Sequence, residues 1–296
     1  MQDSKSLYSR CFAEYRISDE CLKRLQHELL SMLVDFKSVC DKYQIDYMLC
    51  GGTALGAVRH QGFIPWDDDV DVMMLRSEFM KLRKVFSKEF PDKYILAEPL
   101  SDPRYVSKMV KIFKKGTTFV EIPTAGVGGP DMIFIDLFLI ENMPAPGLKR
   151  KLKALAYNTA FRAASVCIDY QYPSPPLLEK EKSNPKLKRY YLFRRALGLL
   201  FTAFGSIQSY LRICEKIAAQ TEKTDWLGIP SDSGYSTRIY PYELFSEITE
   251  TPFCGHKMKI PKRYDFYLKH EYGDYMQIPP PEKREYHVAY MISFEE

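Results

Sequence analysis

Apolar residues in the first half of the chain follow helical spacing in some segments and form short runs in others. Between residues 19 and 43 they recur every three or four positions, which predicts an amphipathic helix capped by Ser18 or Asp19. The shorter runs predict strands with helices between them. We expect strands at residues 45–50, 70–74, 94–97, 105–113, 118–122 and 132–140, and helices at residues 53–60 and 77–90, the second capped by Ser77. This alternation predicts an α/β fold.

The pattern changes after Pro146. Residues 148–168 and 187–221 have helical patterns, whereas the proline-rich stretch at 170–185 is expected to be a loop. From residue 226 the chain returns to short strands and loops. We therefore expect three parts, which are a core at residues 1–146, a basic helical insertion at residues 147–225 and a C-terminal segment at residues 226–296.

Positive charge is concentrated in the helical insertion. Residues 149–216 contain 14 Lys and Arg but 4 Asp and Glu. Such a stretch can bind an anionic membrane surface or a lipid-linked, phosphate-bearing acceptor, and residues 197–211 are apolar enough to lie at an interface. The alternative is a solvated helical insertion. Nucleic acid is not expected as a partner, because the sequence has neither a basic and aromatic groove pattern nor a known binding motif.

The sequence gives no sign of export or of a membrane span. Its first residues, MQDSKSLYSRC, contain no apolar run, and no apolar stretch approaches the roughly 18 to 20 residues of a spanning helix. The seven cysteines are irregularly spaced without a CxxC pair, which is typical of reduced, buried thiols. We therefore expect a soluble cytoplasmic protein, with peripheral contact to the inner face of the membrane as an alternative location.

A run of aspartates provides the first candidate chemistry. In the segment DDDVDV, side chains on a strand alternate between faces, so Asp69 and Asp71 share one face while Val70 and Val72 enter the core. Two carboxylates about 4 Å apart repel by roughly 4 kcal/mol at an effective dielectric near 20. A bridging Mg²⁺ or Mn²⁺ relieves this repulsion, since both ions prefer hard oxygen ligands.

A further carboxylate interrupts the apolar strand MIFIDLFLI. A charge there is costly unless it is paired, so Asp136 is expected to join Asp69 and Asp71 if its strand neighbours theirs. Asp136 is a candidate metal ligand and also a candidate base that accepts the proton of an attacking hydroxyl.

Two glycines precede the aspartates, between a predicted strand and a predicted helix. Gly51 and Gly52 allow close approach of the backbone, the first N–H groups of a helix attract phosphate, and Thr53 adds a hydroxyl donor. Together with the carboxylates they predict a phosphate-binding cradle that faces a metal site.

Each of these features also has an ordinary structural explanation. Asp67 and Asp68 are compatible with a solvated turn, a Gly-Gly pair alone is weak evidence, and Asp136 is compatible with a buried cap. The combination of all three features, in this order and on predicted strands, favours the site.

The motifs that carry these residues resemble those of the LicD family. The run GGTALGAVRHQGFIPWDDDVDV is the most specific, and the resemblance continues through KIFKKGTTF, FIDLF and, near the end, YLKHEYGDYMQIPPPEKREYH. It spans most of the chain apart from the basic helical insertion. Cys50 departs from the aromatic or small residue that is more usual before the glycines, and we interpret it as a packing residue.

The resemblance implies a nucleotidyltransferase-like fold with a mixed β-sheet, in which Asp69 and Asp71 match the metal-binding pair and Asp136 the third acidic position. The family includes enzymes that move phosphocholine from CDP-choline to a sugar hydroxyl and release CMP, and related members transfer ribitol or glycerol phosphate from a CDP-polyol. It therefore implies a CDP-alcohol donor, with CDP-choline favoured, and an acceptor that is a cell-surface glycan or its lipid-linked precursor. It also implies that the C-terminal segment folds back over the site.

Four further residues are candidates for binding the donor. The guanidinium group of Arg59 matches phosphate oxygens, and Trp66 beside the carboxylates can stack on cytosine or hold a choline head group. Lys108 and Lys111 are expected to share one face of a strand and to face the diphosphate. The alternatives are a surface charge for Arg59 and core packing for Trp66.

Two other functions compete with transfer of a phospho-alcohol. One is nucleotidyl transfer, in which an NTP loses pyrophosphate and the nucleotide stays on the acceptor. The other is a non-enzymatic, nucleotide-binding regulator with a degenerate site, against which the intact Asp69, Asp71 and Asp136 argue.

Overall fold

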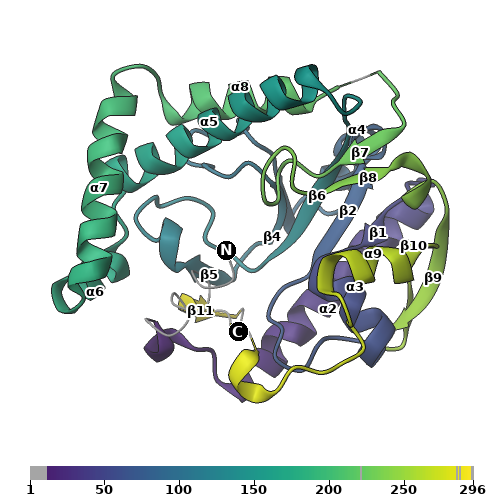
Figure 1. The fold of residues 1–296 in the computed structure, drawn as a ribbon. Helices are drawn as coiled ribbons and strands as arrows, with labels where there is room; N and C mark the ends of the chain where they lie inside the picture. Colours follow the sequence, from purple (N-terminus) through teal and green to yellow (C-terminus); the bar gives the residue numbers. More distant parts are fainter. Residues whose placement is uncertain (1–11, 221, 285, 287, 295–296) are drawn as a thin grey trace.

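The computed structural model describes residues 12–220, 222–284, 286 and 288–294. It confirms the expected α/β class, with a mixed sheet between helices and a separate group of long helices at one side (Figure 1).

A central sheet holds five of the strands from the first half of the chain. Its order is β1-β2-β6-β4-β3, where β2 and β6 run parallel and the other neighbours antiparallel. The predicted strands are present, although those expected at residues 45–50 and 105–113 are shorter than predicted. The bounds are β1 Met48–Leu49, β2 Asp71–Leu75, β3 Tyr94–Ala97, β4 Val110–Lys114 and β6 Phe134–Asn142.

Three helices pack around this sheet. Helix α2 (Asp19–Lys42) matches its prediction, and the Ser18 side chain caps it by accepting a hydrogen bond from the N–H of Cys21. Helix α3 (Gly51–His60) begins at the glycines, two residues earlier than predicted. Helix α4 (Arg76–Glu89) has Leu75 at its N-cap, so the prediction of a Ser77 cap is wrong. The buried apolar side chains of these helices and of the sheet form one continuous core.

The basic insertion is helical throughout most of its length. It contains α5 (Leu148–Gln171), α6 (Pro175–Ser183), α7 (Pro185–Thr202) and α8 (Ile207–Ala218). The loop predicted at residues 170–185 is wrong, because prolines at the first positions of α6 and α7 are compatible with helix starts. Smaller apolar clusters, separate from the main core, hold α5 and α8 together.

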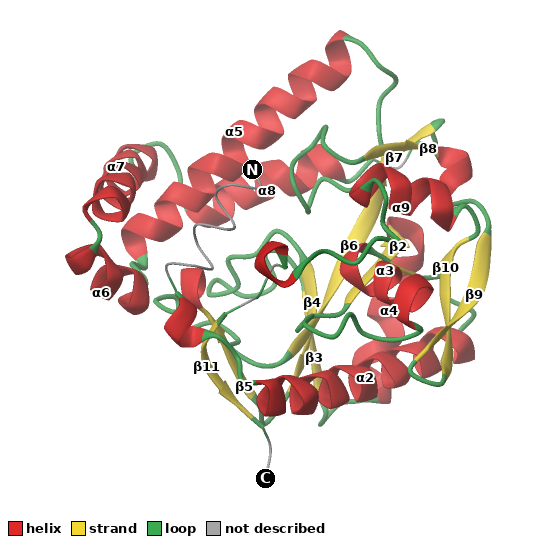
Figure 2. Cartoon of the chain, turned by 60° about the horizontal axis from the view of Figure 1, so that its bottom comes forward, coloured by secondary structure: helices red, strands yellow, loops and turns green. Residues whose placement is uncertain are grey.

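The C-terminal segment returns to the sheet at several places. Strand β7 (Trp226–Gly228) extends it by pairing with β6 and with β8 (Ile239–Pro241). Strands β9 (Ile248–Phe253) and β10 (His256–Pro261) form a hairpin, followed by helix α9 (Tyr264–Tyr272). Figure 2 shows this hairpin and helices α6 and α7 on opposite sides of the molecule. The last strand pairs with a strand of the core, β11 (Ala289–Ser293) with β5 (Thr118–Glu121).

Among the described residues, no single helix is both long and apolar enough to cross a membrane. Helices α7 and α8 reach that length and apolar character only together, and the chain bends by 82° between them. Four of the six described cysteines are buried, and all six are free thiols.

Candidate active site

The two parallel strands of the sheet bring the predicted carboxylates together. Asp71 on β2 is in register with Asp136 on β6, and strands in a sheet lie about 4.8 Å apart. The alternation predicted around Asp71 is confirmed, since Val70 and Val72 are fully buried while Asp69 and Asp71 are partly exposed. The N–H of Asp136 donates to the carbonyl of Val70, which ties the two strands together beside Asp69 and Asp71.

The loop before β2 adds more carboxylates than the alternation pattern predicts. Asp67, Asp68 and Asp69 each offer an oxygen atom, and these three oxygens lie within 4.8 Å of one another. Asp68 is buried, so this stretch is more than a solvated turn. Alternation on a strand could not reveal this arrangement because Asp67 and Asp68 belong to a loop.

The start of α3 lies against the same carboxylates. Gly51 has a φ of +54°, and a Cβ atom there would lie 2.6 Å from Oδ2 of Asp71. A Cβ atom on Gly52 would lie 2.8 Å from Oδ2 of Asp67. The backbone conformation of Gly51 thus favours glycine, and a side chain at either position would displace an aspartate oxygen, while phosphate binding here stays a prediction.

Thr53 and Tyr267 fix this helix start in place. The side-chain oxygen of Thr53 accepts a hydrogen bond from the N–H of Asp71 at 2.8 Å, so its role is to join α3 to β2. The hydroxyl oxygen of Tyr267 accepts from the N–H of Gly51 at 3.0 Å. Because carboxylates line the helix start, an anionic diphosphate can approach it closely only when a cation offsets their charge.

One carboxylate oxygen of Asp136 is enclosed by the protein. Burial raises its pKa to about 7, the charge of Lys111 opposes this rise, and the charges of Glu121 and Asp69 add to it. Its Oδ1 atom is buried and accepts no hydrogen bond from the described residues. A hard-oxygen set with an unsatisfied buried oxygen fits a divalent cation.

Lys111 lies between carboxylates instead of facing an open site. Its Nζ atom is 3.0 Å from Oε2 of Glu121, 3.5 Å from Oδ1 of Asp136 and 3.3 Å from the centre of the Phe134 ring. It is on β4, whereas Lys108 precedes that strand, so the expectation that both lysines share one strand face is wrong. This placement favours a role for Lys111 in holding Asp136, and phosphate binding by Lys111 stays a prediction.

Arg59 joins α3 to the C-terminal segment. Its Nη1 atom donates to the carbonyl of Tyr275 at 2.7 Å and to that of Gln277 at 3.4 Å. Burial lowers its pKa. These contacts hold the C-terminal segment close to the carboxylates, and phosphate binding by Arg59 stays a prediction.

Trp66 is partly buried beside the carboxylate loop. The guanidinium group of Arg284 lies 4.2 Å from the centre of its ring, and the core packs against it. A cation over the indole is compatible with the predicted preference for a cationic head group, although here the chain supplies that cation itself. Binding of the donor by Trp66 stays a prediction.

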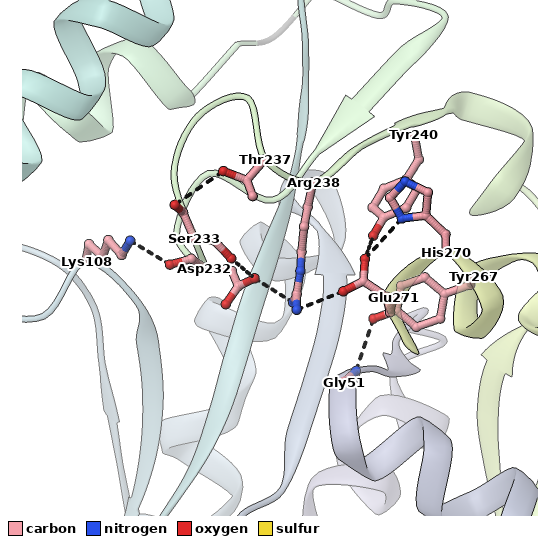
Figure 3. A network of polar contacts seen from close by, with 10 residues as sticks. All are labelled: Gly51, Lys108, Asp232, Ser233, Thr237, Arg238, Tyr240, Tyr267, His270 and Glu271. Carbon is pink, nitrogen blue, oxygen red and sulfur yellow. Dashed lines mark hydrogen bonds and ion pairs between the residues drawn. The ribbon is translucent and has the colours of Figure 1, made fainter. Parts of the chain in front are cut away.

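A charged network that the sequence did not predict adjoins this site (Figure 3). Arg238 bridges two carboxylates, with Nη1 2.5 Å from Asp232 and Nη2 2.8 Å from Glu271. The pKa of Tyr272 is raised by burial and next by the charge of Asp71, with Arg238 opposing. Asp71 and Arg238 therefore both act on Tyr272, and no motif marks Arg238 because it comes from a loop far along the chain.

Comparison with known proteins agrees with this geometry. Residues 44–120 match the model of the family described as LicD/FKTN/FKRP, nucleotidyltransferase domain. The lipopolysaccharide cholinephosphotransferase LicD of Haemophilus influenzae is 29% identical over 269 residues, which cover 90% of this chain and 95% of that protein. The chain is therefore similar to LicD-type phosphotransferases, in the matched domain and, at lower identity, over most of its length. The resemblance given by the sequence motifs is therefore confirmed.

Two further proteins match over shorter lengths. Uncharacterized proteins of Rickettsia prowazekii and Rickettsia typhi are 39% and 38% identical over 72 and 71 residues, or 24% of this chain in each case and 26% and 22% of those proteins. The matched LicD domain contains Gly51, Gly52, Asp69 and Asp71 but ends before Asp136. The inclusion of Asp136 in the site therefore rests on the register of its strand with β2.

Proposed function

We propose that this protein transfers phosphocholine from CDP-choline to a hydroxyl group of a cell-surface glycan or its lipid-linked precursor, with Mg²⁺ or Mn²⁺ as cofactor and CMP as the leaving product. The name of the Haemophilus relative supports phosphocholine as the transferred group and lipopolysaccharide as the kind of acceptor. The observation that carries the metal-dependent chemistry is the register of Asp71 with Asp136 beside the glycines of α3.

Asp69 and Asp71 would hold the cation, with Asp67 and Asp68 next to them, and Asp136 would be either a third ligand or the base. A bound divalent cation would neutralise the diphosphate of the donor and the charge that develops on departing CMP. The N-terminal turn of α3 and the guanidinium group of Arg238 would orient the diphosphate at the carboxylates.

Asp136 has properties that suit a general base. With a pKa raised to about 7, chiefly by burial, it can accept a proton near neutral pH. The acceptor oxygen would attack the phosphorus that carries choline, the bond from this phosphorus to the oxygen of CMP would break, and the acceptor proton would pass to Asp136.

The experiment is to incubate the protein with Mg²⁺, glycan extract and either CDP-choline, CDP-ribitol or CDP-glycerol, and to measure CMP release. We expect the highest rate with CDP-choline and none after the metal is chelated. Asp71→Asn should lower kcat by about 10² to 10³ because a charge that stabilises the transition state is lost. Asp92→Asn, in the exposed turn before β3, is the matched control and should retain the wild-type rate.

Product mass separates the competing functions. Addition of phosphocholine with release of CMP supports the proposal, whereas addition of a nucleotide from an NTP with release of pyrophosphate supports nucleotidyl transfer. Tight binding of a CDP-alcohol without turnover on any acceptor supports a regulator. Full metal-dependent turnover by Asp71→Asn would exclude the proposed site.

A binding measurement tests the metal site without activity. Mg²⁺ or Mn²⁺ should raise the Tm of the wild-type protein, because a ligand that binds only the folded state stabilises it. The same ions should leave the Tm of Asp71→Asn nearly unchanged.

A further inference from the structure

Helix α7 presents apolar side chains to the outside of the molecule. Five large ones at its surface and just beyond its end are between 54% and 78% exposed, namely Leu192, Phe193, Leu199, Leu200 and Phe204. They recur at helical spacing, so they form one continuous stripe instead of scattered single residues. A contiguous apolar stripe of this kind is unusual on the surface of a soluble monomer.

The charged residues in the middle of the same helix point the other way, toward the protein. Arg194 bonds to Asp169 and, through Nη2, to the Ser165 hydroxyl at 2.7 Å, both on α5. Arg195 makes a bidentate pair with Glu181 of α6, with both N···O distances at 2.7 Å. The helix is therefore attached to its neighbours by charge pairs while its apolar side remains outside.

The beginning of α7 carries exposed positive charge. Lys186, Lys188 and Arg189 lie in its first two turns and are exposed, and the helix contains no Asp or Glu. Basic residues flanking an apolar stripe are typical of helices that lie in the interface of an anionic membrane. Protein interfaces, in contrast, are depleted in lysine.

The shape of the helix pair argues for a helix that lies on a membrane surface. The chain bends by 82° between α7 and α8. One side of α8 is buried against α5 through Ile207, Leu211 and Cys214. Because α8 packs against α5, α7 and α8 cannot form one straight helix that spans a membrane.

We propose that α7 docks this protein on an anionic lipid bilayer, with its apolar stripe in the interfacial layer and its first turns on the lipid head groups. The exposed leucines of α5, Leu148, Leu152 and Leu155, lie on one side of that helix and alternate with Lys149 and Lys151. They form a second, smaller surface of the same chemistry. This docking surface is independent of the reaction at the carboxylates.

The first test is sedimentation of the full chain with lipid vesicles. The protein should bind vesicles of phosphatidylcholine and phosphatidylglycerol and bind weakly to phosphatidylcholine alone. Because each basic residue near the surface contributes about fivefold to partitioning, Lys186→Gln/Lys188→Gln/Arg189→Gln should weaken binding to the anionic vesicles about a hundredfold. The control is Lys23→Gln/Lys84→Gln/Lys88→Gln, which removes three exposed lysines from α2 and α4 and should bind as the wild type does.

The second test reports insertion of the stripe itself. Phe193→Trp should show a blue shift on anionic vesicles and quenching by brominated lipid, whereas Met291→Trp on β11, similarly exposed, should show neither. Phe193→Ser/Leu200→Ser should reduce vesicle binding while keeping the wild-type Tm in solution. Equal vesicle binding by all variants would overturn the proposal. Concentration-dependent self-association that the serine variant abolishes, without vesicle binding, would assign the stripe to a second copy of this chain instead.

Discussion

Helices α2 and α7 contain similar residues but differ in which of them face the protein. In α2, the side chains of Leu25, Leu29, Met32, Leu33 and Phe36 are at most 1% exposed, and the charged residues face water. In α7, five large apolar residues are exposed, whereas two arginines and the partly buried Leu187, Tyr191 and Phe201 face the protein. Full apolar burial therefore attaches α2 to the core, whereas ion pairs, close backbone contact and partial apolar burial attach α7 to its neighbours.

The difference indicates that the two regions are adapted to different surroundings. The region around α2 keeps the carboxylates aligned, because its packing is continuous with the strands that carry them. The region around α7 contributes little apolar burial to the fold, so its exposed residues are free to contact another surface. Mutations that compare the two regions test this interpretation.

The largest effect is expected from a matched pair of phenylalanines. Phe36→Ala in α2 should lower the free energy of unfolding by about 4 kcal/mol, because it leaves a cavity in a closed core. Phe193→Ala in α7 should change it by less than about 0.5 kcal/mol in the absence of lipid. Urea denaturation of both variants gives the comparison, and similar losses would mean that the exposed side of α7 is covered in solution.

The next largest effect on stability is expected from the ion pairs of Arg76, which lie where the two regions meet. Arg76 at the start of α4 bonds to Glu141 on β6 and to Glu215 on α8, with Glu141 almost fully buried. Arg76→Met should cost about 3 kcal/mol because it leaves a buried carboxylate unpaired. Glu215→Gln should cost less than about 1 kcal/mol, since that carboxylate is partly exposed.

The pH dependence of the stability lost in Arg76→Met shows whether the unpaired Glu141 causes that loss. Burial raises the pKa of Glu141, while Arg76 opposes the rise. Without Arg76 the pKa rises further, and a raised carboxylate pKa means that stability is lost as pH increases. The loss of unfolding free energy in Arg76→Met should therefore become smaller as pH falls toward 5. A loss that does not depend on pH would indicate lost packing instead.

The sequence predicted the core well because the elements of the core, like α2 and unlike α7, bury their large apolar residues. Where apolar residues are buried on one side, as in α2, their spacing predicts both the element and its buried face. The carboxylates followed from this, because Val70 and Val72 fixed the side on which Asp69 and Asp71 lie. The prediction that Asp136 joins Asp69 and Asp71 depended on neighbouring strands, and the pairing of β2 with β6 meets this condition, whereas their parallel register was not predicted.

Other parts of the site depend on long-range contacts that no local pattern encodes. Arg238, Tyr267 and Glu121 reach the site through chain reversals far from the aspartates. The helix α6 was missed because prolines normally indicate loops, although Pro175 is at a position where a helix accepts proline. The direction of the apolar side of α7 was also not predictable, since spacing alone does not say whether the apolar or the charged side faces the protein.

A smaller effect concerns a buried cation between the regions. Burial lowers the pKa of Lys108 to about 8, although the charge of Asp232 opposes this, and its Nζ atom donates to the carbonyl of Asp232 beside the ring of Phe161. The unfolded chain holds the proton to higher pH, so stability should rise by about 2 kcal/mol from pH 8 to pH 10. Lys108→Met should remove this rise, measured as the difference between the two proteins because tyrosines titrate above this range. If the stability of Lys108→Met depends on pH as that of the wild type does, the charge of Lys108 is not buried.

The smallest effect is expected at the closest contact between α5 and α7. Gly198 is the one buried residue of α7, and a Cβ atom there would lie 2.1 Å from the carbonyl oxygen of Val166 and 2.6 Å from Cβ of Tyr170. Gly198→Ala gains about 1 kcal/mol of helix propensity but should lose about 2 kcal/mol to overpacking, for a net loss near 1 kcal/mol. Hydrogen exchange should quicken in α7 and stay unchanged in α2. Ala196→Gly, on the exposed side, loses only helix propensity and serves as the control. If Gly198→Ala instead stabilises the protein, α7 is not held against α5 by this contact, and its ion pairs alone account for its attachment.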